Sequence, residues 1–306
     1  MKTYINSTRK SSILPLPTLK SVSKLILVIG IVSLSLYGYG MMQPESVAYS
    51  QSTLVLGHAG SGFFSPINPF NPLPSNSMAS IVKAMEEHGA DGVEVDVHVS
   101  KDGIPILYHD TSLETMSEGT GMIEQLPASE VVGLRYKGGI FYDLFHNETI
   151  ITLEKMIQLF QTSADLPYLH IDVRNHDANR STFYAESLLD LLRKYQYPLE
   201  KLAFIFPDAT LLQTIRELEP GAVLMLDAGN DFDVSVQEAL AHNLHGVTAN
   251  GKRVTKEQVQ RAKEQGLQIV LFGGKSRGSI AQMLEMEPDA IQVNNVKRMR
   301  ALMEKR

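Results

Sequence analysis

The sequence predicts an α/β protein whose folded part is a TIM-type (β/α)8 barrel, preceded by a separate N-terminal hydrophobic segment. Short apolar runs alternate along the chain with longer segments of helical spacing, and there are eight such runs. The part of the chain that holds them, residues 49–306, is 258 residues long, close to the roughly 250 that an eightfold barrel needs. An open, doubly wound sheet is the alternative, because the pattern alone does not show closure.

The N-terminal segment has the composition of an export signal. Residues 1–24 carry five basic residues and no acidic one, and Leu25 to Met42 is an 18-residue stretch without a charge. This is typical of a signal peptide or a membrane anchor, at the short edge of the roughly 20 residues that span a bilayer. A buried core helix is a less favoured interpretation, since a core helix would not follow a basic, acid-free leader.

The charge around this stretch predicts its orientation. Basic residues before it keep the N-terminus in the cytoplasm and send the remainder outward, and Ser46-Val47-Ala48 offers a small-x-small pattern for a signal peptidase. We therefore expect residues 1–48 to be a signal peptide or membrane anchor. Residues 49–306 are expected to be exported, as a secreted or periplasmic domain or one anchored to the outer side of the cytoplasmic membrane.

The eight predicted strands are short and rich in Val, Ile and Leu. Strands separated by helices pair in parallel and are buried on both faces, which explains their nearly continuous apolar character. They are Thr53 to Leu56, Gly92 to Val97, Leu169 to Val173, Leu202 to Phe206, Ala222 to Leu226, Gly246 to Ala249, Gln268 to Phe272 and Ala290 to Val293.

Composition excludes several classes of function. The chain has no cysteine, so it contains no disulfide, zinc–thiolate site, iron–sulfur cluster or cysteine nucleophile. Residues 49–306 carry 23 basic and 33 acidic residues, a net charge of −10. An acidic domain is a poor match for a polyanion, so we do not expect nucleic acid as a partner.

The second predicted strand carries two carboxylates. Glu94 and Asp96 are two residues apart, so they point to the same face of the strand, while the valines between them point to the other. Inside a barrel these carboxylates would repel each other and lose hydration unless a cation joined them. Asp172, on the next barrel strand, can complete an oxygen-ligand set suited to a divalent metal, Mg²⁺ or Ca²⁺. The alternative is that the pair faces solvent or binds Arg and Lys.

Two histidines lie at predicted strand ends. His58 follows the first run, and His109 ends an extended segment, Ile104 to Asp110, that follows the second. Near neutral pH one imidazole can accept a proton while another donates one. Beside a metal site, His58 and His109 can therefore serve as the base and acid of a phosphoryl transfer. A purely structural role for both histidines is the alternative.

The stretch from Gly89 to Asp110 resembles the glycerophosphodiester phosphodiesterase family. It contains a Glu-x-Asp pair, then Lys-Asp-Gly and His-Asp, and weaker matches extend over nearly all of residues 53–296. The resemblance implies a metal-dependent barrel that cleaves glycerol phosphodiesters to sn-glycerol 3-phosphate and an alcohol. It also implies that His58 and His109 are the acid–base pair and that Glu94, Asp96 and Asp172 are the metal ligands.

The chain departs from the family pattern at several positions. The family usually has Arg where this chain has Ala59, and its Pro-Glu-Asn-Thr element is Pro74-Ser75-Asn76-Ser77 here. The third metal ligand is usually Glu rather than Asp172, and Lys is usual where Arg174 stands. We expect Arg174, which can bind phosphate in bidentate fashion, and Lys275 to supply the missing positive charge.

These features together predict a metal-dependent phosphodiester hydrolase acting on glycerophosphodiesters or lyso-lipid head groups. One alternative is a phospholipase D-like or C-like lipid hydrolase on the same barrel, since the loop with Phe63, Phe64, Ile67 and Phe70 offers apolar contacts to a lipid surface. The other is a noncatalytic binding protein with a decayed site, which the missing Arg would favour. The N-terminal segment would attach the protein to a membrane if it is not cleaved.

Overall fold

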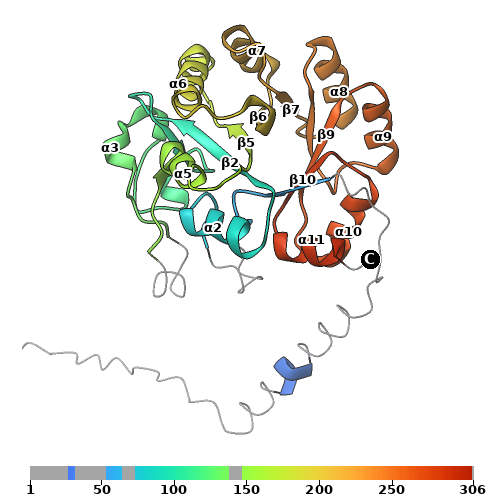
Figure 1. Ribbon diagram of the computed structural model, residues 1–306. Helices are drawn as coiled ribbons and strands as arrows, with labels where there is room; N and C mark the ends of the chain where they lie inside the picture. The colour runs from blue at the N-terminus through green and yellow to red at the C-terminus, as the bar shows by residue number, and fades with distance from the viewer. Residues whose placement is uncertain (1–26, 32–52, 64–72, 138–146, 305–306) are drawn as a thin grey trace, which may run out of the picture. The chain divides into compact units, whose positions relative to one another are not determined.

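The eight apolar runs form one closed barrel of parallel strands in the computed structural model (Figure 1). The structure describes residues 27–31, 53–63, 73–137 and 147–304. Neighbouring barrel strands follow one another in chain order, and the first strand pairs with both the second and the last, which closes the sheet. The predicted TIM-type barrel is confirmed, and the open sheet is excluded.

The strands agree with the predicted runs to within two residues at most ends. The barrel strands are β1 (Leu54–Gly57), β2 (Gly92–Val99), β5 (Tyr168–Val173), β6 (Leu202–Phe206), β7 (Leu224–Asp227), β8 (Gly246–Asn250), β9 (Gln268–Gly273) and β10 (Ala290–Val293).

Helices between the strands surround the barrel (Figure 1). The α-helices are α2 (Met78–Val82), α3 (Ala128–Val131), α5 (Leu153–Phe160), α6 (Ser181–Lys194), α7 (Ala209–Leu218), α8 (Phe232–Ala241), α9 (Lys256–Glu264), α10 (Arg277–Glu285) and α11 (Val296–Met303). A π-helix, η1 (Lys83–Glu87), continues α2, and four 3₁₀ turns are η2 (Leu113–Thr115), η3 (Ile123–Gln125), η4 (Ala178–Arg180) and η5 (Leu199–Lys201).

One excursion interrupts the barrel after β2. This strand extends past the barrel and pairs antiparallel with β3 (Pro105–Leu107), which pairs with β4 (Ile151–Thr152). A small apolar core that includes Leu113, Ile123 and Tyr136 supports the residues between these two short strands. The excursion places the segment after β3, which carries His109, at the C-terminal end of β2.

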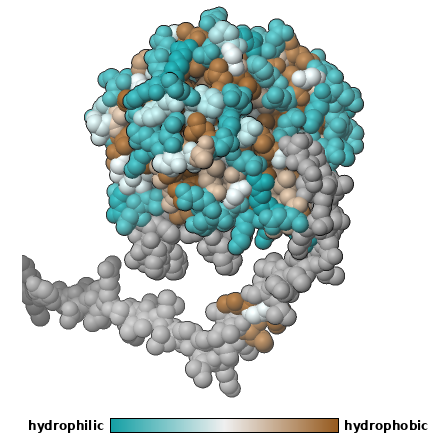
Figure 2. All heavy atoms as spheres, viewed as in Figure 1, coloured by the Kyte–Doolittle hydropathy of each residue, from teal (hydrophilic) through white to brown (hydrophobic). Residues whose placement is uncertain are grey.

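The two faces of the barrel strands have different neighbours. Val93, Val95 and Val97 belong to the large core between the strands and the surrounding helices. The opposite face of the sheet points into the barrel, where a smaller apolar cluster includes Leu56, Ile205 and Met225. The surface outside the helices is largely hydrophilic in the view of Figure 2. The alternation predicted for β2 therefore aims Glu94 and Asp96 into the barrel.

A glycine allows β2 to approach β5. A Cβ atom at Gly92 would lie 2.0 Å from the carbonyl oxygen of Tyr168, a distance that no side chain tolerates. Gly92 and Tyr168 are partners in the parallel register, as are Asp96 and Asp172 four residues further along. The absence of a side chain at Gly92 is thus one condition for the juxtaposition of the two aspartates.

The chain divides into two compact units, residues 1–44 and residues 45–306. In the first unit the structure describes only a short helical segment, residues 27–31. No helix within the described ranges is long and apolar enough to cross a membrane. The rest of the predicted signal or anchor segment lies outside the described residues, so its function stays a prediction.

Candidate active site

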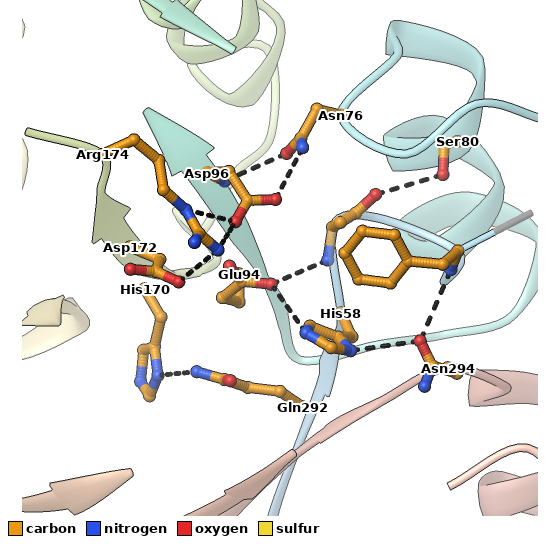
Figure 3. A network of polar contacts seen from close by, with 12 residues as sticks. His58, Asn76, Ser80, Glu94, Asp96, His170, Asp172, Arg174, Gln292 and Asn294 are labelled. Carbon is orange, nitrogen blue, oxygen red and sulfur yellow. Dashed lines mark hydrogen bonds and ion pairs between the residues drawn. The ribbon is translucent and has the colours of Figure 1, made fainter. Parts of the chain in front are cut away.

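Three carboxylates converge at the C-terminal end of the barrel. Glu94, Asp96 and Asp172 each place one oxygen within 4.8 Å of the others, and Figure 3 shows them pointing toward one another from β2 and β5. Glu94 and Asp96 are only 2% and 1% exposed. The structure thus brings together all three side chains predicted as metal ligands.

Asp96 is held from two sides. The Asn76 side-chain amide donates to Asp96 Oδ2 over 2.7 Å, and the Asp96 backbone N–H donates to Asn76 Oδ1 over 3.0 Å. On the other side, Arg174 Nε donates to Asp96 Oδ1 over 3.0 Å. Burial alone would raise the pKa of Asp96, but Arg174, His109 and these hydrogen bonds outweigh it and hold the pKa below its usual value. Asp96 is therefore the ionised member of the group.

Glu94 has fewer compensating contacts. Its Oε2 accepts a hydrogen bond of 2.8 Å from the backbone N–H of Ala59 and lies 3.8 Å from His58 Nε2. Burial, and then the charges of Asp96 and Asp172, raise the pKa of Glu94 well above its usual value. The burial of Glu94 therefore disfavours its charged form, which a bound cation would stabilise.

The pKa of Asp172 is raised as well, although Asp172 forms an ion pair. Arg174 Nη2 donates to its Oδ2 over 2.7 Å, and the same nitrogen also contacts Asp96. Burial nevertheless raises the pKa of Asp172 to about 8, with Asp96 and Asp227 adding repulsion against the partial compensation by Arg174. One guanidinium therefore does not neutralise the three carboxylates.

The donor set fits a divalent cation. When all three carboxylates are ionised, the single arginine leaves an excess of two negative charges in this largely buried site, and a doubly charged ion would balance it. Carboxylate oxygens without nitrogen or sulfur ligands suit Mg²⁺ or Ca²⁺. Glu94, Asp96 and Asp172 would hold such an ion, which on binding would displace the protons that the raised pKa values of Glu94 and Asp172 favour.

His58 lies at the edge of this carboxylate site. It follows β1 directly, and its Nδ1 lies 3.1 Å from Asn294 Oδ1, at the end of β10. The backbone N–H of Phe63 points to the same Asn294 oxygen over 3.4 Å. Burial lowers the pKa of His58 to about 4, with smaller and opposing effects from Asp96 and Asn294. The imidazole is therefore neutral near pH 7.

His109 lies across from His58, on the segment after β3. The ring of Phe63 stands between them, with ring centres 4.9 Å from His58 and 4.8 Å from His109, each in an edge-to-face arrangement. His109 Nδ1 lies 3.1 Å from Asp110 Oδ1, and the His109 side chain is 38% exposed. The two predicted acid–base residues thus pack against the same Phe63 ring, and His58 also lies beside the Glu94 carboxylate.

The two predicted phosphate-binding residues are placed differently. Arg174 is at the carboxylate site, 29% exposed, with its guanidinium bridging Asp96 and Asp172. Lys275 is exposed in the loop between β9 and α10. Among the described residues Lys275 forms no hydrogen bond or ion pair. Of the two predicted phosphate-binding residues, only Arg174 therefore contacts the carboxylates.

Two residues at the site, Asn76 and Asn294, were not predicted to have a role, and Phe63 was predicted only as part of an apolar loop. Asn76 orients Asp96, Asn294 orients His58, and Phe63 separates the two histidines. Asn76 stands in the Pro74-Ser75-Asn76-Ser77 element, which drew attention only for its missing acid. Of the apolar loop considered for lipid contact, Phe64, Ile67 and Phe70 lie outside the described residues.

Ala59, which stands where the family usually has Arg, acts through its backbone. Its φ is +47°, an uncommon conformation for a residue with a side chain, and it turns the Ala59 N–H toward Glu94. The Ala59 carbonyl oxygen accepts hydrogen bonds from the backbone of Asn76 and from Ser80 Oγ. Through these hydrogen bonds the turn after β1 contacts Glu94 directly and Asp96 by way of Asn76.

Comparison with known proteins identifies the family. The family model described as the glycerophosphoryl diester phosphodiesterase family matches residues 65–298, which include β2, β5 and all three carboxylates. The chain belongs to this family. The resemblance seen in the sequence is thereby confirmed for the barrel domain.

Individual relatives match parts of the chain. A glycerophosphodiester phosphodiesterase from Caldanaerobacter subterraneus is 33% identical over 108 residues, covering 35% of this chain and 40% of its own length. One from Bacillus altitudinis is 26% identical over 225 residues, covering 71% of this chain and 88% of its own length. The chain thus spans less than half the length of the first of these curated relatives.

Solved structures share the fold. A putative glycerophosphoryl diester phosphodiesterase from Silicibacter pomeroyi has a TM-score of 0.70 at 19% identity, with 87% of this chain and 96% of that chain covered. A phosphodiesterase from Oleispira antarctica, solved in complex with the product sn-glycerol-3-phosphate, has a TM-score of 0.69 at 20% identity, with 82% and 96% covered. These similarities support the barrel architecture of the family.

Proposed function

We propose that this protein is a metal-dependent glycerophosphodiester phosphodiesterase, which hydrolyses its substrate to sn-glycerol 3-phosphate and an alcohol. The observation that carries the proposal is the convergence of three carboxylates near two histidines at the C-terminal end of the barrel. Family membership supports the reaction class, and relatives that match the chain are glycerophosphodiester phosphodiesterases by name.

Glu94, Asp96 and Asp172 would hold Mg²⁺ or Ca²⁺ in this reaction. A bound divalent ion offsets the negative charge that grows on the phosphoryl oxygens in the transition state. The protein residues supply the orientation. Asn76 and Arg174 fix both oxygens of Asp96, and the Ala59 N–H fixes Glu94, so the ligands are aligned before an ion or a substrate arrives.

His58 is the proposed general base. Since Asn294 Oδ1 is an acceptor, His58 Nδ1 carries the proton and Nε2 keeps its lone pair, directed toward the carboxylate site. The lowered pKa keeps this ring neutral at pH 7. Nε2 would take the proton of the attacking hydroxyl. If that hydroxyl belongs to water, sn-glycerol 3-phosphate forms directly; if it is the free glycerol hydroxyl of the substrate, a cyclic phosphate forms and water then opens it to the same product.

His109 is the proposed general acid. It is more exposed than His58, and its Nδ1 lies 3.1 Å from Asp110 Oδ1. It would donate a proton to the oxygen of the departing alcohol as the phosphorus–oxygen bond breaks. Arg174 and Lys275 are the proposed phosphate contacts, since both are cations at the C-terminal ends of barrel strands.

The proposed reaction takes place outside the cytoplasm. The basic leader and the uncharged stretch from Leu25 to Met42 support an exported domain, secreted, periplasmic or anchored to the outer side of the cytoplasmic membrane. The proposed substrate is a soluble glycerophosphodiester or the head group of a lyso-lipid. A membrane would be a partner only through an uncleaved N-terminal segment.

Release of sn-glycerol 3-phosphate from glycerophosphocholine tests the proposal. We expect release by the full chain with Mg²⁺ or Ca²⁺, loss of release with a chelator, and recovery when the ion is restored. Hydrolysis of a bilayer lipid without hydrolysis of glycerophosphocholine would instead support a phospholipase-like enzyme. Tight binding of glycerophosphodiesters without any product would support a noncatalytic protein. Either result would overturn the proposal.

A further inference from the structure

A second group of metal-ligating side chains lies beside the carboxylate site. It comprises His98 near the C-terminal end of β2, Glu124 in the 3₁₀ turn η3, and His176 shortly after β5. Each offers one ligand atom, and these atoms lie within 4.8 Å of one another. None of the three is among the ligands or acid–base residues assigned above. We call this group the histidine–glutamate cluster.

The spacing of the cluster is close to that of a coordination sphere. Glu124 Oε1 lies 3.0 Å from His176 Nδ1 and 3.9 Å from His98 Nδ1. Ligand atoms about 2.1 Å from a tetrahedral ion are about 3.4 Å apart, which lies between these two values. Small rotations of the side chains would therefore bring all three atoms to one ion.

His98 supplies an independent indication. Its side chain is 1% exposed, and neither ring nitrogen has a hydrogen-bond partner among the described residues. A buried polar group without a partner is costly and rare in native proteins. An ion bound to Nδ1 would satisfy the nitrogen that faces Glu124, and it would explain why a histidine occupies this buried position.

The surroundings of the cluster orient its other members. The Tyr184 hydroxyl donates to Glu124 Oε1 over 2.8 Å, and the backbone N–H of His176 donates to the same oxygen over 3.1 Å. His176 Nδ1 donates to Glu124 Oε1 here. Because the Thr111 hydroxyl, 3.2 Å from Nε2, can also accept a hydrogen bond, the ring proton can move to Nε2 when an ion binds Nδ1. Such supporting hydrogen bonds commonly fix the tautomer and orientation of metal-bound histidines.

We propose that the histidine–glutamate cluster binds a transition-metal ion of the zinc class, separate from the divalent ion of the carboxylate site. Two imidazoles and one carboxylate suit Zn²⁺ or Co²⁺, whereas three carboxylates suit Mg²⁺ or Ca²⁺. His176 is 37% exposed, which gives an ion a route from solvent. Three protein ligands leave the remaining coordination position to water.

The site connects strands that also build the carboxylate site. β2 carries Asp96 and His98, and the end of β5 leads from Asp172 to His176. Tyr184 also donates to the carbonyl oxygen of Arg174 over 3.1 Å. A bound ion would therefore tie together the ends of β2 and β5, and we expect it to raise the thermal stability of the protein.

Cobalt binding to the full chain tests the proposal without any enzymatic assay. After dialysis against excess Mg²⁺, the wild-type protein is expected to retain about one equivalent of Co²⁺ with visible absorption bands of nitrogen coordination. The Glu94→Gln/Asp172→Asn variant, which lacks two carboxylate ligands, is expected to retain that equivalent. His176→Gln, at a partly exposed position, is expected to weaken Co²⁺ binding by at least about 10-fold.

His242→Gln is the matched control, because His242 is an exposed histidine at the end of α8, outside both sites, and it is expected to bind Co²⁺ as the wild type does. Circular dichroism checks that each variant is folded. Unchanged binding by a folded His176→Gln variant, or loss of the retained equivalent from the Glu94→Gln/Asp172→Asn variant, would overturn the proposal.

Discussion

The two ends of the barrel interior differ in what fills them. At the C-terminal end the inward positions of β2 and β5 carry three carboxylates that repel one another. Toward the N-terminal end the inward positions include the apolar residues Ala203, Met225 and Val270, and they line a cavity of about 380 Å³. The same alternation of side chains thus produces a charged site at one end and a packed but incomplete core at the other.

The catalytic groups and the groups that stabilise the fold thus lie at different ends of the barrel interior. Charged groups gathered without water reduce the stability of the fold, and apolar groups removed from water increase it. Substitutions at the two ends are therefore expected to act on different properties.

The largest expected effect is at the charged end. Glu94→Gln keeps an oxygen that can accept the Ala59 N–H but removes a charge from the metal ligands. We therefore expect the turnover rate to fall by about 10³-fold or more. The thermal stability without metal is expected to stay equal or rise, because a carboxyl with a raised pKa is removed. Glu264→Gln, an exposed position on α9, is the control for both measurements. Near-normal activity in Glu94→Gln would contradict the assigned ligand.

The acid–base residues are expected to give the next largest effect. His109→Gln should lower the turnover rate by about 10²-fold to 10⁴-fold and remove one limb of its pH profile. Since His109 is 38% exposed, the free energy of unfolding should barely change. Steady-state kinetics across pH measures the first effect and urea unfolding the second. A large loss of stability would show that this end of the barrel also supports the fold.

The apolar end is expected to respond in the opposite way. Met225 is 1% exposed inside the barrel and lines the cavity, and Met225→Ala should reduce the free energy of unfolding by about 2–4 kcal/mol, since it enlarges a void and removes apolar contacts. The turnover of the folded variant should remain close to that of the wild type. Denaturant unfolding paired with kinetics at low temperature would check both. A loss of turnover without a loss of stability would contradict the assignment of this end of the barrel to stability alone.

The smallest expected effect lies between the two ends. His170 is directed inward on β5, two residues before Asp172, and lies 3.1 Å from Gln292 (Figure 3). Burial lowers its pKa to about 4 from 6.5. Above pH 6.5 the ring is neutral in both states. As the pH falls from 6.5 to 4, only the unfolded chain takes up the proton, so the free energy of unfolding decreases by at most about 3 kcal/mol.

His170→Gln should remove this pH dependence. Urea unfolding of the wild type and the variant at several pH values between 7 and 4 isolates the contribution of His170, because the other groups titrate in both proteins. Parallel curves would show that the ring is hydrated in the folded protein, through the cavity that it lines.

Much of the barrel and part of the site were predictable from the residues. The eight apolar runs are all barrel strands, and the two-residue spacing of Glu94 and Asp96 correctly placed both inside the barrel. The contribution of Asn76 was not predictable, because a polar residue in a loop carries no periodic signal. The histidine–glutamate cluster was also missed, since Glu124 comes from a 3₁₀ turn in the excursion after β3.

The sequence by itself determined the strands, their inward faces and the carboxylates that those faces carry, because alternation is a local property of an extended chain. The tertiary structure alone decided which side chains orient them. It placed Asn294 beside His58 and Arg174 between Asp96 and Asp172. Such contacts depend on closure of the barrel and on the register between strands, which no local pattern of residues encodes.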